Sequence, residues 1–170
     1  MRLARYDEIE KSRYEDYIAE WEAGGGRIVP SASDPKGRGF EEMLAKWRVD
    51  ESDEAFAQGF VPSTLHFLED ADGRLLGAIH FRHVLNPRLE ANGGHIGYGV
   101  RPSERRRGYA SLMLRMLLEG LRAGGPDRVL LTCDEGNVAS ARTIEGCGGV
   151  LAERALFEGA WTRKYWISLR

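Results

Sequence analysis

The sequence predicts an α+β fold in which two helices precede a sheet, with further helices placed between its later strands. Apolar residues repeat with helical spacing near the start of the chain, and strand patterns with a period of two begin at residue 63. A strand, a long apolar helix and a second strand then follow one another. A chain of 170 residues suits one domain. We therefore expect a single domain over 1–170, with a helical region at 1–62 and a sheet core at 63–170.

Amphipathic spacing predicts the two N-terminal helices. In the first, an apolar face is formed at i, i+3, i+4 and i+7 by Tyr14, Tyr17, Ile18 and Trp21. Three glycines at 24–26 end this helix, and a loop rich in Pro, Ser and Gly follows. The second helix has the same spacing in Phe40, Met43, Leu44 and Trp47. We expect these aromatic side chains to pack in a core rather than to line a ligand site.

The sheet core begins with a hairpin, because two strand patterns flank a short Asp-Gly turn. The segment "GGHIGYGV" at 93–100 is a further strand with glycines inside it, and glycine weakens a strand unless something comes close to its backbone. Asn137 is a suitable N-cap for the last helix. The later elements are predicted as a helix over 109–125, a buried strand over 127–134, a helix over 137–149 and strands over 150–157 and 163–170.

Composition excludes several classes of protein. Twenty-six acidic and 24 basic residues give a net charge of −2, which argues against disorder and against a surface built for nucleic acid. No apolar run reaches the length of about 18 residues that spans a bilayer, and the N-terminus does not resemble a signal peptide. Cys133 and Cys147 lack metal-ligand spacing, so we expect reduced, buried thiols. The expectation is a cytoplasmic protein that uses no metal and binds no membrane.

The stretch "GVRPSERRRGYASLML" at 99–114 carries the main functional signal. Arg105, Arg106 and Arg107 precede Gly108 at the point where a strand gives way to a helix. Helix N-termini bind anions through unpaired N–H groups, and three cations there are unfavourable unless an anion is present. The pattern indicates a pyrophosphate site. A solvated arginine cluster paired with acids such as Glu104, or a nucleic-acid contact, remains the alternative.

Arg105-x-x-Gly108-x-Ala110 resembles the pyrophosphate-binding signature of the GCN5-related N-acetyltransferases (GNAT), and the likeness extends over about 65–170. The chain looks like an uncharacterised bacterial branch of that superfamily. The resemblance implies a mostly antiparallel central sheet, with acetyl-CoA between two splayed strands and the acceptor on the side of residues 1–62. It also implies a bulge at Gly99 and close approach of the ligand at Gly97 and Gly99. The implied acetyl-CoA contacts are Tyr98, Gly99, Val100, Arg105, Arg106, Arg107, Gly108, Tyr109, Ala110, Asn137 and Ser140.

The resemblance leaves the catalytic groups open. Many relatives have a Glu at the position of His95, and imidazole titrates near 6.5, so His95 is the candidate base, directly or through water. The tyrosine that protonates the thiolate in many relatives is replaced by Ile144. Tyr98 is the first candidate to take its place, with Tyr109 and Tyr165 as others. Neither cysteine has an activating base for a covalent route.

The expected activity is transfer of an acetyl group from acetyl-CoA, as co-substrate, to an amine of a small molecule or peptide in a ternary complex. A module that binds CoA without catalysis is the alternative, and a nucleic-acid-binding domain is a third possibility. The acidic residues of the N-terminal region favour a cationic acceptor amine. Members of this family are often dimers, so a homodimer is possible.

Overall fold

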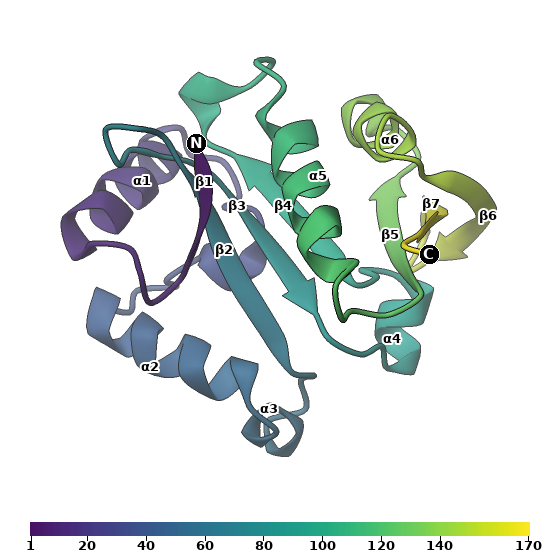
Figure 1. The fold of residues 1–170 in the computed structure, drawn as a ribbon, viewed down its shortest axis with the longest axis horizontal. Helices are drawn as coiled ribbons and strands as arrows, with labels where there is room; N and C mark the ends of the chain where they lie inside the picture. The colour runs from purple at the N-terminus through teal and green to yellow at the C-terminus, as the bar shows by residue number, and fades with distance from the viewer.

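The computed structural model describes residues 1–170 and contains two antiparallel sheets. The first sheet has the order β1-β2-β3-β4, and the second has the order β5-β7-β6 (Figure 1). The strands are β1 (Arg2–Arg5), β2 (Ser63–Glu69), β3 (Leu75–Arg82), β4 (Ile96–Val100), β5 (Arg128–Asp134), β6 (Val150–Phe157) and β7 (Ala160–Ser168). The helices are α1 (Lys11–Ala23), α2 (Phe40–Glu51), α3 (Glu54–Ala57), α4 (Pro87–Ala91), α5 (Tyr109–Leu121) and α6 (Val138–Glu145), and 3-10 turns lie at Ser31–Ser33 and Pro102–Glu104.

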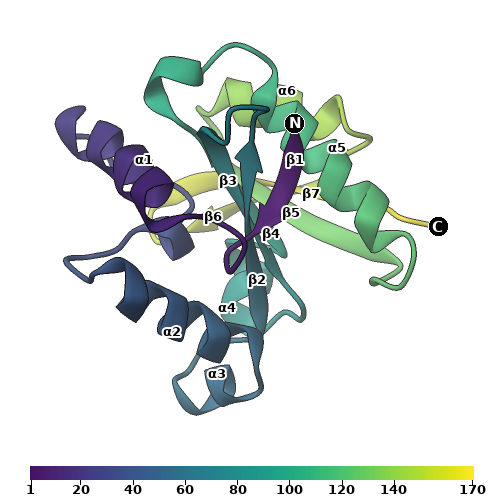
Figure 2. The ribbon, with the colours of Figure 1, turned by 60° about the vertical axis from the view of Figure 1, so that its left-hand side comes forward.

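The fold therefore confirms the predicted α+β class. Helices α1 and α2 cover one face of the first sheet, and α5 lies on its other face (Figures 1 and 2). Two apolar cores result, one on each face of that sheet, and the core under α5 continues into the second sheet. None of the helices combines the length and the apolar composition that crossing a bilayer requires.

The N-terminal region departs from the prediction in one respect. Residues 1–62 are not only helical, because β1 pairs antiparallel with β2 along the edge of the first sheet, with Arg2 opposite Glu69. A strand of four residues is too short to show a period in the sequence. The helices α3 and α4 were not predicted, because they too are short. Strand β7 begins at Ala160, three residues before the predicted strand.

The aromatic residues of α1 and α2 pack as predicted. Tyr14 meets Trp47 edge to face, with ring centroids 5.4 Å apart, and Phe67 of β2 lies beneath both rings. Such pairs stabilise a core by about 0.5–1.5 kcal/mol beyond the area that they bury. Both helices are therefore held by packing on the sheet, and the loop between them is carried toward β4.

This loop makes a close backbone contact at Gly99 of β4. A Cβ added at Gly99 would overlap the carbonyl oxygen of Val29, whereas one added at Gly97 would lie 3.8 Å from Pro30. The glycine at 99 thus admits a neighbouring loop of the protein. Pairing between β3 and β4 also runs without a register shift, so the bulge expected at Gly99 is absent.

Gly99→Ala should lower the free energy of unfolding by about 1–3 kcal/mol, because the new methyl group meets rigid backbone. Gly97→Ala is the matched control on the same strand face and should change it by less than about 1 kcal/mol. Urea unfolding of the two variants checks this. Equal stability of the two would contradict the close contact.

Candidate functional site

The two sheets meet only at one end of a gap between β4 and β5. His95, just before β4, donates its N–H to the carbonyl of Leu130 at 2.7 Å, and Nδ1 of His95 accepts the N–H of Leu130 at 2.9 Å. Beyond this pair the two strands belong to separate sheets. Figure 1 shows them diverging away from α4, with α5 lying over the space between them. This is the splayed strand pair that the resemblance implied.

The edge of β4 that faces this gap has unpaired backbone groups. The carbonyl of His95 accepts from Arg82 of β3, and the N–H of Arg101 donates to Leu76 of β3. Because residues in an antiparallel pair alternate in direction, the odd-numbered residues between them also bond to β3. The backbone groups of residues 96, 98 and 100 therefore point into the gap. Of the strand residues expected to contact acetyl-CoA, Tyr98 and Val100 direct their backbone groups into the gap, whereas the backbone groups of Gly99 bond to β3.

The facing edge belongs to β5. Leu169 donates to the carbonyl of Asp127, and Glu135 donates to Trp161, so the odd-numbered residues of β5 bond to β7. Residues 130, 132 and 134 consequently face β4. Leu130 is used by His95, and the rest of this edge has no strand partner. The gap thus has the form of a sheet from which one strand is missing.

The arginine loop lies between β4 and α5 and has the backbone of an anion-binding turn. Arg106 and Gly108 have φ of 65° and 82°, in the left-handed region that costs a non-glycine residue about 1–2 kcal/mol. The six successive backbone N–H groups of residues 106–111 donate to no acceptor in the protein. Consecutive N–H groups in such a turn form a concave donor site for anions.

The three arginines have different surroundings. The guanidinium of Arg105 lies over the ring of Trp21, 5.1 Å from its centroid, and that of Arg107 is paired with Glu104 at 2.5 Å. Arg106 makes no ion pair or hydrogen bond with the protein and is exposed. The solvated-cluster alternative therefore explains Arg107 alone. Arg106 is free to bind an anion, and Arg105, which also donates to the carbonyl of Val100 at 3.4 Å, has no carboxylate partner.

Ion pairs of the buried Arg101 fix this loop to α1. Arg101, at the end of β4, is 4% exposed and pairs with Asp16 at 2.8 Å and with Glu20. Glu20 also accepts the backbone N–H of Ser103 at 2.7 Å. Desolvation raises the pKa of Glu20, but the hydrogen bonds from Ser103 and Arg101 outweigh it and hold the pKa at about 2. The carboxylate stays charged at neutral pH and keeps the loop in place.

His95 is held in a neutral form. Burial, and then the charge of Arg82, lowers its pKa to about 4. Since Nδ1 accepts from Leu130, the proton of the neutral ring is on Nε2. The one lone pair that a base would use is therefore occupied by a backbone N–H. This geometry makes His95 a hydrogen-bond donor at Nε2 and a tie between the strands, which differs from the base proposed from the sequence.

Tyr98 points from β4 toward the start of α6. Its hydroxyl lies 2.9 Å from Oγ of Ser140, and burial raises its pKa to about 12, so the phenol keeps its proton. Asn137 caps α6 by accepting the N–H of Ser140 at 3.1 Å, which leaves its amide NH₂ free to donate. The structure thus brings Tyr98, Asn137 and Ser140 together at one side of the gap.

The remaining candidates lie apart from this group. Ile144 is buried in the core under α5, and the hydroxyl of Tyr165 donates to Glu145 at 2.9 Å. Tyr109 opens α5 and lies beneath the guanidinium of Arg107. Burial raises the pKa of both free thiols, Cys133 and Cys147, which weakens them as nucleophiles.

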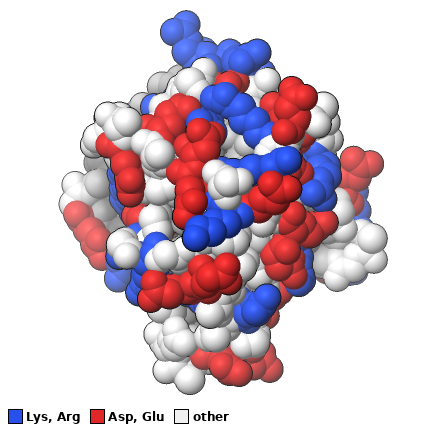
Figure 3. All heavy atoms as spheres, turned by 90° about the vertical axis from the view of Figure 1, so that its left-hand side faces the viewer, with Lys and Arg blue, Asp and Glu red and all other residues white.

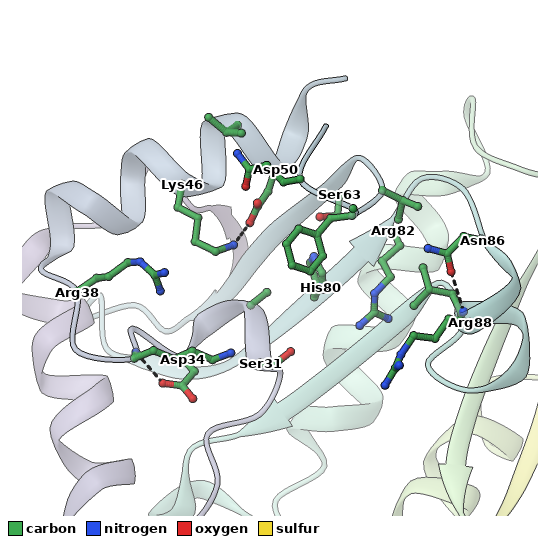
Figure 4. A pocket seen from close by; sticks show the side chains of 18 of the residues that line it. Ser31, Asp34, Arg38, Lys46, Asp50, Ser63, His80, Arg82, Asn86 and Arg88 are labelled. Atoms are coloured by element: carbon green, nitrogen blue, oxygen red, sulfur yellow. Dashed lines mark hydrogen bonds and ion pairs between the residues drawn. The ribbon is translucent and has the colours of Figure 1, made fainter. Parts of the chain in front are cut away.

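A cavity of about 770 Å³ lies on the sheet face opposite α5, between α2, β3 and α4 (Figure 4). Its wall includes Ser31 and Ala32, which follow the loop contact with β4, and Arg82, which donates to the carbonyls of Gly93 and Gly94 just before His95. The cavity therefore adjoins the joined end of the gap. The sequence did not predict its polar side chains, although a charged residue at the end of an apolar strand, such as Arg82, was a usable signal.

The core encloses Trp21, Phe40 and Trp47, as expected for the aromatic residues of the two N-terminal helices. Phe56 and Phe60 are exposed, and Phe60 lines the cavity. Basic and acidic groups alternate over the surface of α1 and α2 without a large region of one sign (Figure 3). No group of three His, Cys, Asp or Glu side chains is arranged to hold a metal ion.

The family model described as an acetyltransferase (GNAT) domain matches residues 8–150, which include β4, the arginine loop, α5 and α6. The chain belongs to the GNAT acetyltransferase family. The match covers most of the chain and confirms the resemblance inferred from the arginine signature. Among curated proteins, no match to the sequence was found.

Solved GNAT structures share this fold. A spermidine N-acetyltransferase from Vibrio cholerae, in a dodecameric structure, has a TM-score of 0.65 at 15% identity over 99% of this chain and 93% of that chain. A putative GNAT-family acetyltransferase from Bordetella pertussis has a TM-score of 0.66 at 16% identity over 98% of this chain and 94% of that chain. RimL, a ribosomal alpha-N-protein acetyltransferase in complex with coenzyme A, has a TM-score of 0.65 at 16% identity over 98% of this chain and 92% of that chain.

The state of His95 predicts a pH dependence of stability. The ring takes a proton near pH 6.5 when the chain is unfolded but only near pH 4 in the fold. The group therefore stabilises the fold fully above pH 6.5, by up to about 3 kcal/mol, and this stabilisation is lost as the pH falls from 6.5 toward 4. Urea unfolding of the wild type and His95→Gln across this range measures it.

The stability difference between wild type and His95→Gln should shrink as the pH falls, because only the wild type has this titrating ring. His66, His80 and His83 also have lowered pKa values and affect both proteins alike. A difference that is constant from pH 7.5 to 4.5 would contradict a buried neutral His95.

Proposed function

We propose that this GNAT-family protein is an acetyl-CoA-dependent N-acetyltransferase that transfers an acetyl group directly to the amine of a small molecule or peptide. The six backbone N–H groups at 106–111 that have no acceptor in the protein carry this proposal. They suit a pyrophosphate, and the exposed side chains of Arg105 and Arg106 suit a further phosphate. When bound, acetyl-CoA supplies the activated acetyl group.

The gap between β4 and β5 supports the same proposal. An extended amide-containing chain can pair with the free backbone edge of β4 as an added strand does. Residues 96, 98 and 100 would bind such a chain, and the free NH₂ of Asn137 would donate to it from the side of α6. His95 and Leu130 close the end of this path, so they set how far the chain enters.

We assign Tyr98 and His95 different roles. Tyr98 donates a hydrogen bond toward the departing thiolate, because its phenol stays protonated at neutral pH and lies at the α6 side of the gap. His95 positions the two strands and presents the Nε2 proton. We propose that residues 1–62 form the acceptor side of one domain, since the cavity lies between α2 and the sheet. Two of the relatives named above are described as acting on spermidine and on a ribosomal protein, which supports an amine acceptor.

Acetyl-CoA at a hundred times its Kd should raise the melting temperature of the wild type by about 5–10 °C, from about 2.7 kcal/mol of binding free energy. Gly108→Trp should abolish this rise, because the new side chain covers the donor groups and strains the backbone of the turn at φ 82°, although open space surrounds position 108. Gly120→Trp, at an exposed position of the same helix with open space, is the matched control and should keep the rise.

No rise in the wild type at millimolar acetyl-CoA would refute the nucleotide site and the enzyme with it. A rise without any release of free thiol in the presence of an amine panel would favour the alternative of a CoA-binding module without catalysis. That alternative draws support from Ile144 and from the occupied lone pair of His95.

Tyr98→Phe should lower the rate of thiol release by about 10- to 100-fold, because it removes the hydroxyl that faces Ser140. The rise in melting temperature with acetyl-CoA should be unchanged, since the proposed binding contacts of residue 98 are backbone groups. An unchanged rate would exclude a role of this hydroxyl in the chemical step.

A further inference from the structure

The cavity beside β3 has an excess of positive charge. Two acidic side chains, Asp34 and Asp50, line it, against five basic ones, an excess of three. The basic side chains are Lys36, Arg38, Lys46, Arg82 and Arg88. Figure 4 shows Arg38 and Lys46 reaching in from the side of α2, and Arg82 and Arg88 from the side of β3 and α4. The charged ends of side chains from four segments thus converge on one space.

Most of this charge has no partner in the fold. Lys46 is neutralised by an ion pair with Asp50, and Arg88 lies 3.6 Å from Glu158 with both side chains largely exposed. Lys36 makes no ion pair. Arg38 contacts only a backbone carbonyl, that of Pro35, at 3.5 Å.

Arg82 is also without a carboxylate. Its guanidinium donates to the carbonyls of Gly93 and Gly94 at 3.2 and 3.0 Å, and burial lowers its pKa. Lys36, Arg38 and Arg82 are therefore the three unpaired cations of the cavity. The one unpaired acid that lines it is Asp34, whose carboxylate accepts the backbone N–H of Lys36 at 3.0 Å. The cavity therefore favours an anionic group in its occupant and disfavours a cationic one.

His80 lies between these cations and itself adds no charge to the cavity. Burial, followed by the charges of Arg82 and Lys46, lowers its pKa well below the ordinary value, so the ring is neutral. Its Nδ1 is buried and has no hydrogen-bond partner. An ammonium group beside these side chains is destabilised relative to the free amine, which lowers its pKa. The site thus favours the nucleophilic, neutral form of an amine without a dedicated base.

We propose that the acceptor of this enzyme is an amine that also carries an acidic group. The acidic group binds at Lys36 and Arg38, and the amine lies toward Arg82 and His80, next to the joined end of the β4–β5 gap. A volume of about 770 Å³ fits a small molecule or a short peptide. The inference rests on the proposed acetyltransferase function, and it runs opposite to the cationic acceptor expected from the sequence, because the acids of that region lie elsewhere or are paired.

Three amines of matched length test the charge preference: 4-aminobutyrate, 4-aminobutanamide and 1,4-diaminobutane. Binding is measured by calorimetry without acetyl-CoA, and transfer is measured by free thiol release with it. The acid should bind and react at least about tenfold better than the amide, from two charge contacts, and the diamine should be poorest. Equal or better binding of the amide or the diamine would overturn the proposal, as would no binding of the acid at millimolar concentration.

Paired variants locate the preference. The double variant Lys36→Gln, Arg38→Gln should bind the acid no better than the amide. Arg48→Gln removes the same kind of charge from the exposed side of α2, outside the cavity, and should keep the preference. Thermal unfolding shows whether each variant is folded. A preference that survives the double variant would overturn the assignment.

The two proposals fail in different ways. Selective binding of the acid that depends on Lys36 and Arg38, with no thermal shift by acetyl-CoA and no thiol release, would leave the anion site standing and refute the enzyme. A thermal shift by acetyl-CoA with transfer to the diamine as fast as to the acid would keep the enzyme and refute the acidic acceptor.

Discussion

The reciprocal hydrogen bonds between His95 and Leu130 are the constraint on which the site depends. They join two sheets at one point, and beyond it the facing edges of β4 and β5 stay apart. An unpaired edge inside a protein is normally a liability, because its N–H and C=O groups need partners. Here it is retained beside a loop whose N–H groups also lack partners. Both features are explained together if an extended, phosphorylated molecule supplies what the chain does not.

Positive charge lies in two separate places, at the arginine loop and in the cavity. At the arginine loop, Glu20 and Arg101 fix the backbone, and main-chain donors lie beside exposed guanidinium groups, as the proposed polyanion would require. In the cavity, the buried, neutral His80 and the largely buried Arg82 lie at the sheet, and the exposed Lys36 and Arg38 lie at the rim. The first arrangement suits strong binding of phosphate. The second suits choice among acceptors and control of amine protonation.

Much of the fold was predictable because its long elements have clear periods. Helices α1, α2 and α5 and the hairpin of β2 and β3 follow from apolar spacing, and the arginine loop follows from its place between strand and helix. The strand β1 was not predictable, since four residues carry no period. Contacts distant in sequence were also hidden: the occupied lone pair of His95 depends on Leu130, and the charge of the cavity depends on segments from 31 to 89. Counting acids in the N-terminal region could not show which of them face the cavity.

The contact of Val29 with Gly99 links the edge of β4 to the cavity. The same loop packs on β4 and continues into the cavity wall at Ser31 and Ala32, so the two binding regions share one rigid boundary. A ligand that shifted β4 would therefore also shift the wall of the cavity. By thermodynamic reciprocity, whichever molecule binds first alters the affinity for the other by the same factor in either order. A single backbone contact, possible only at a glycine, thus connects the edge of β4 with the wall of the cavity.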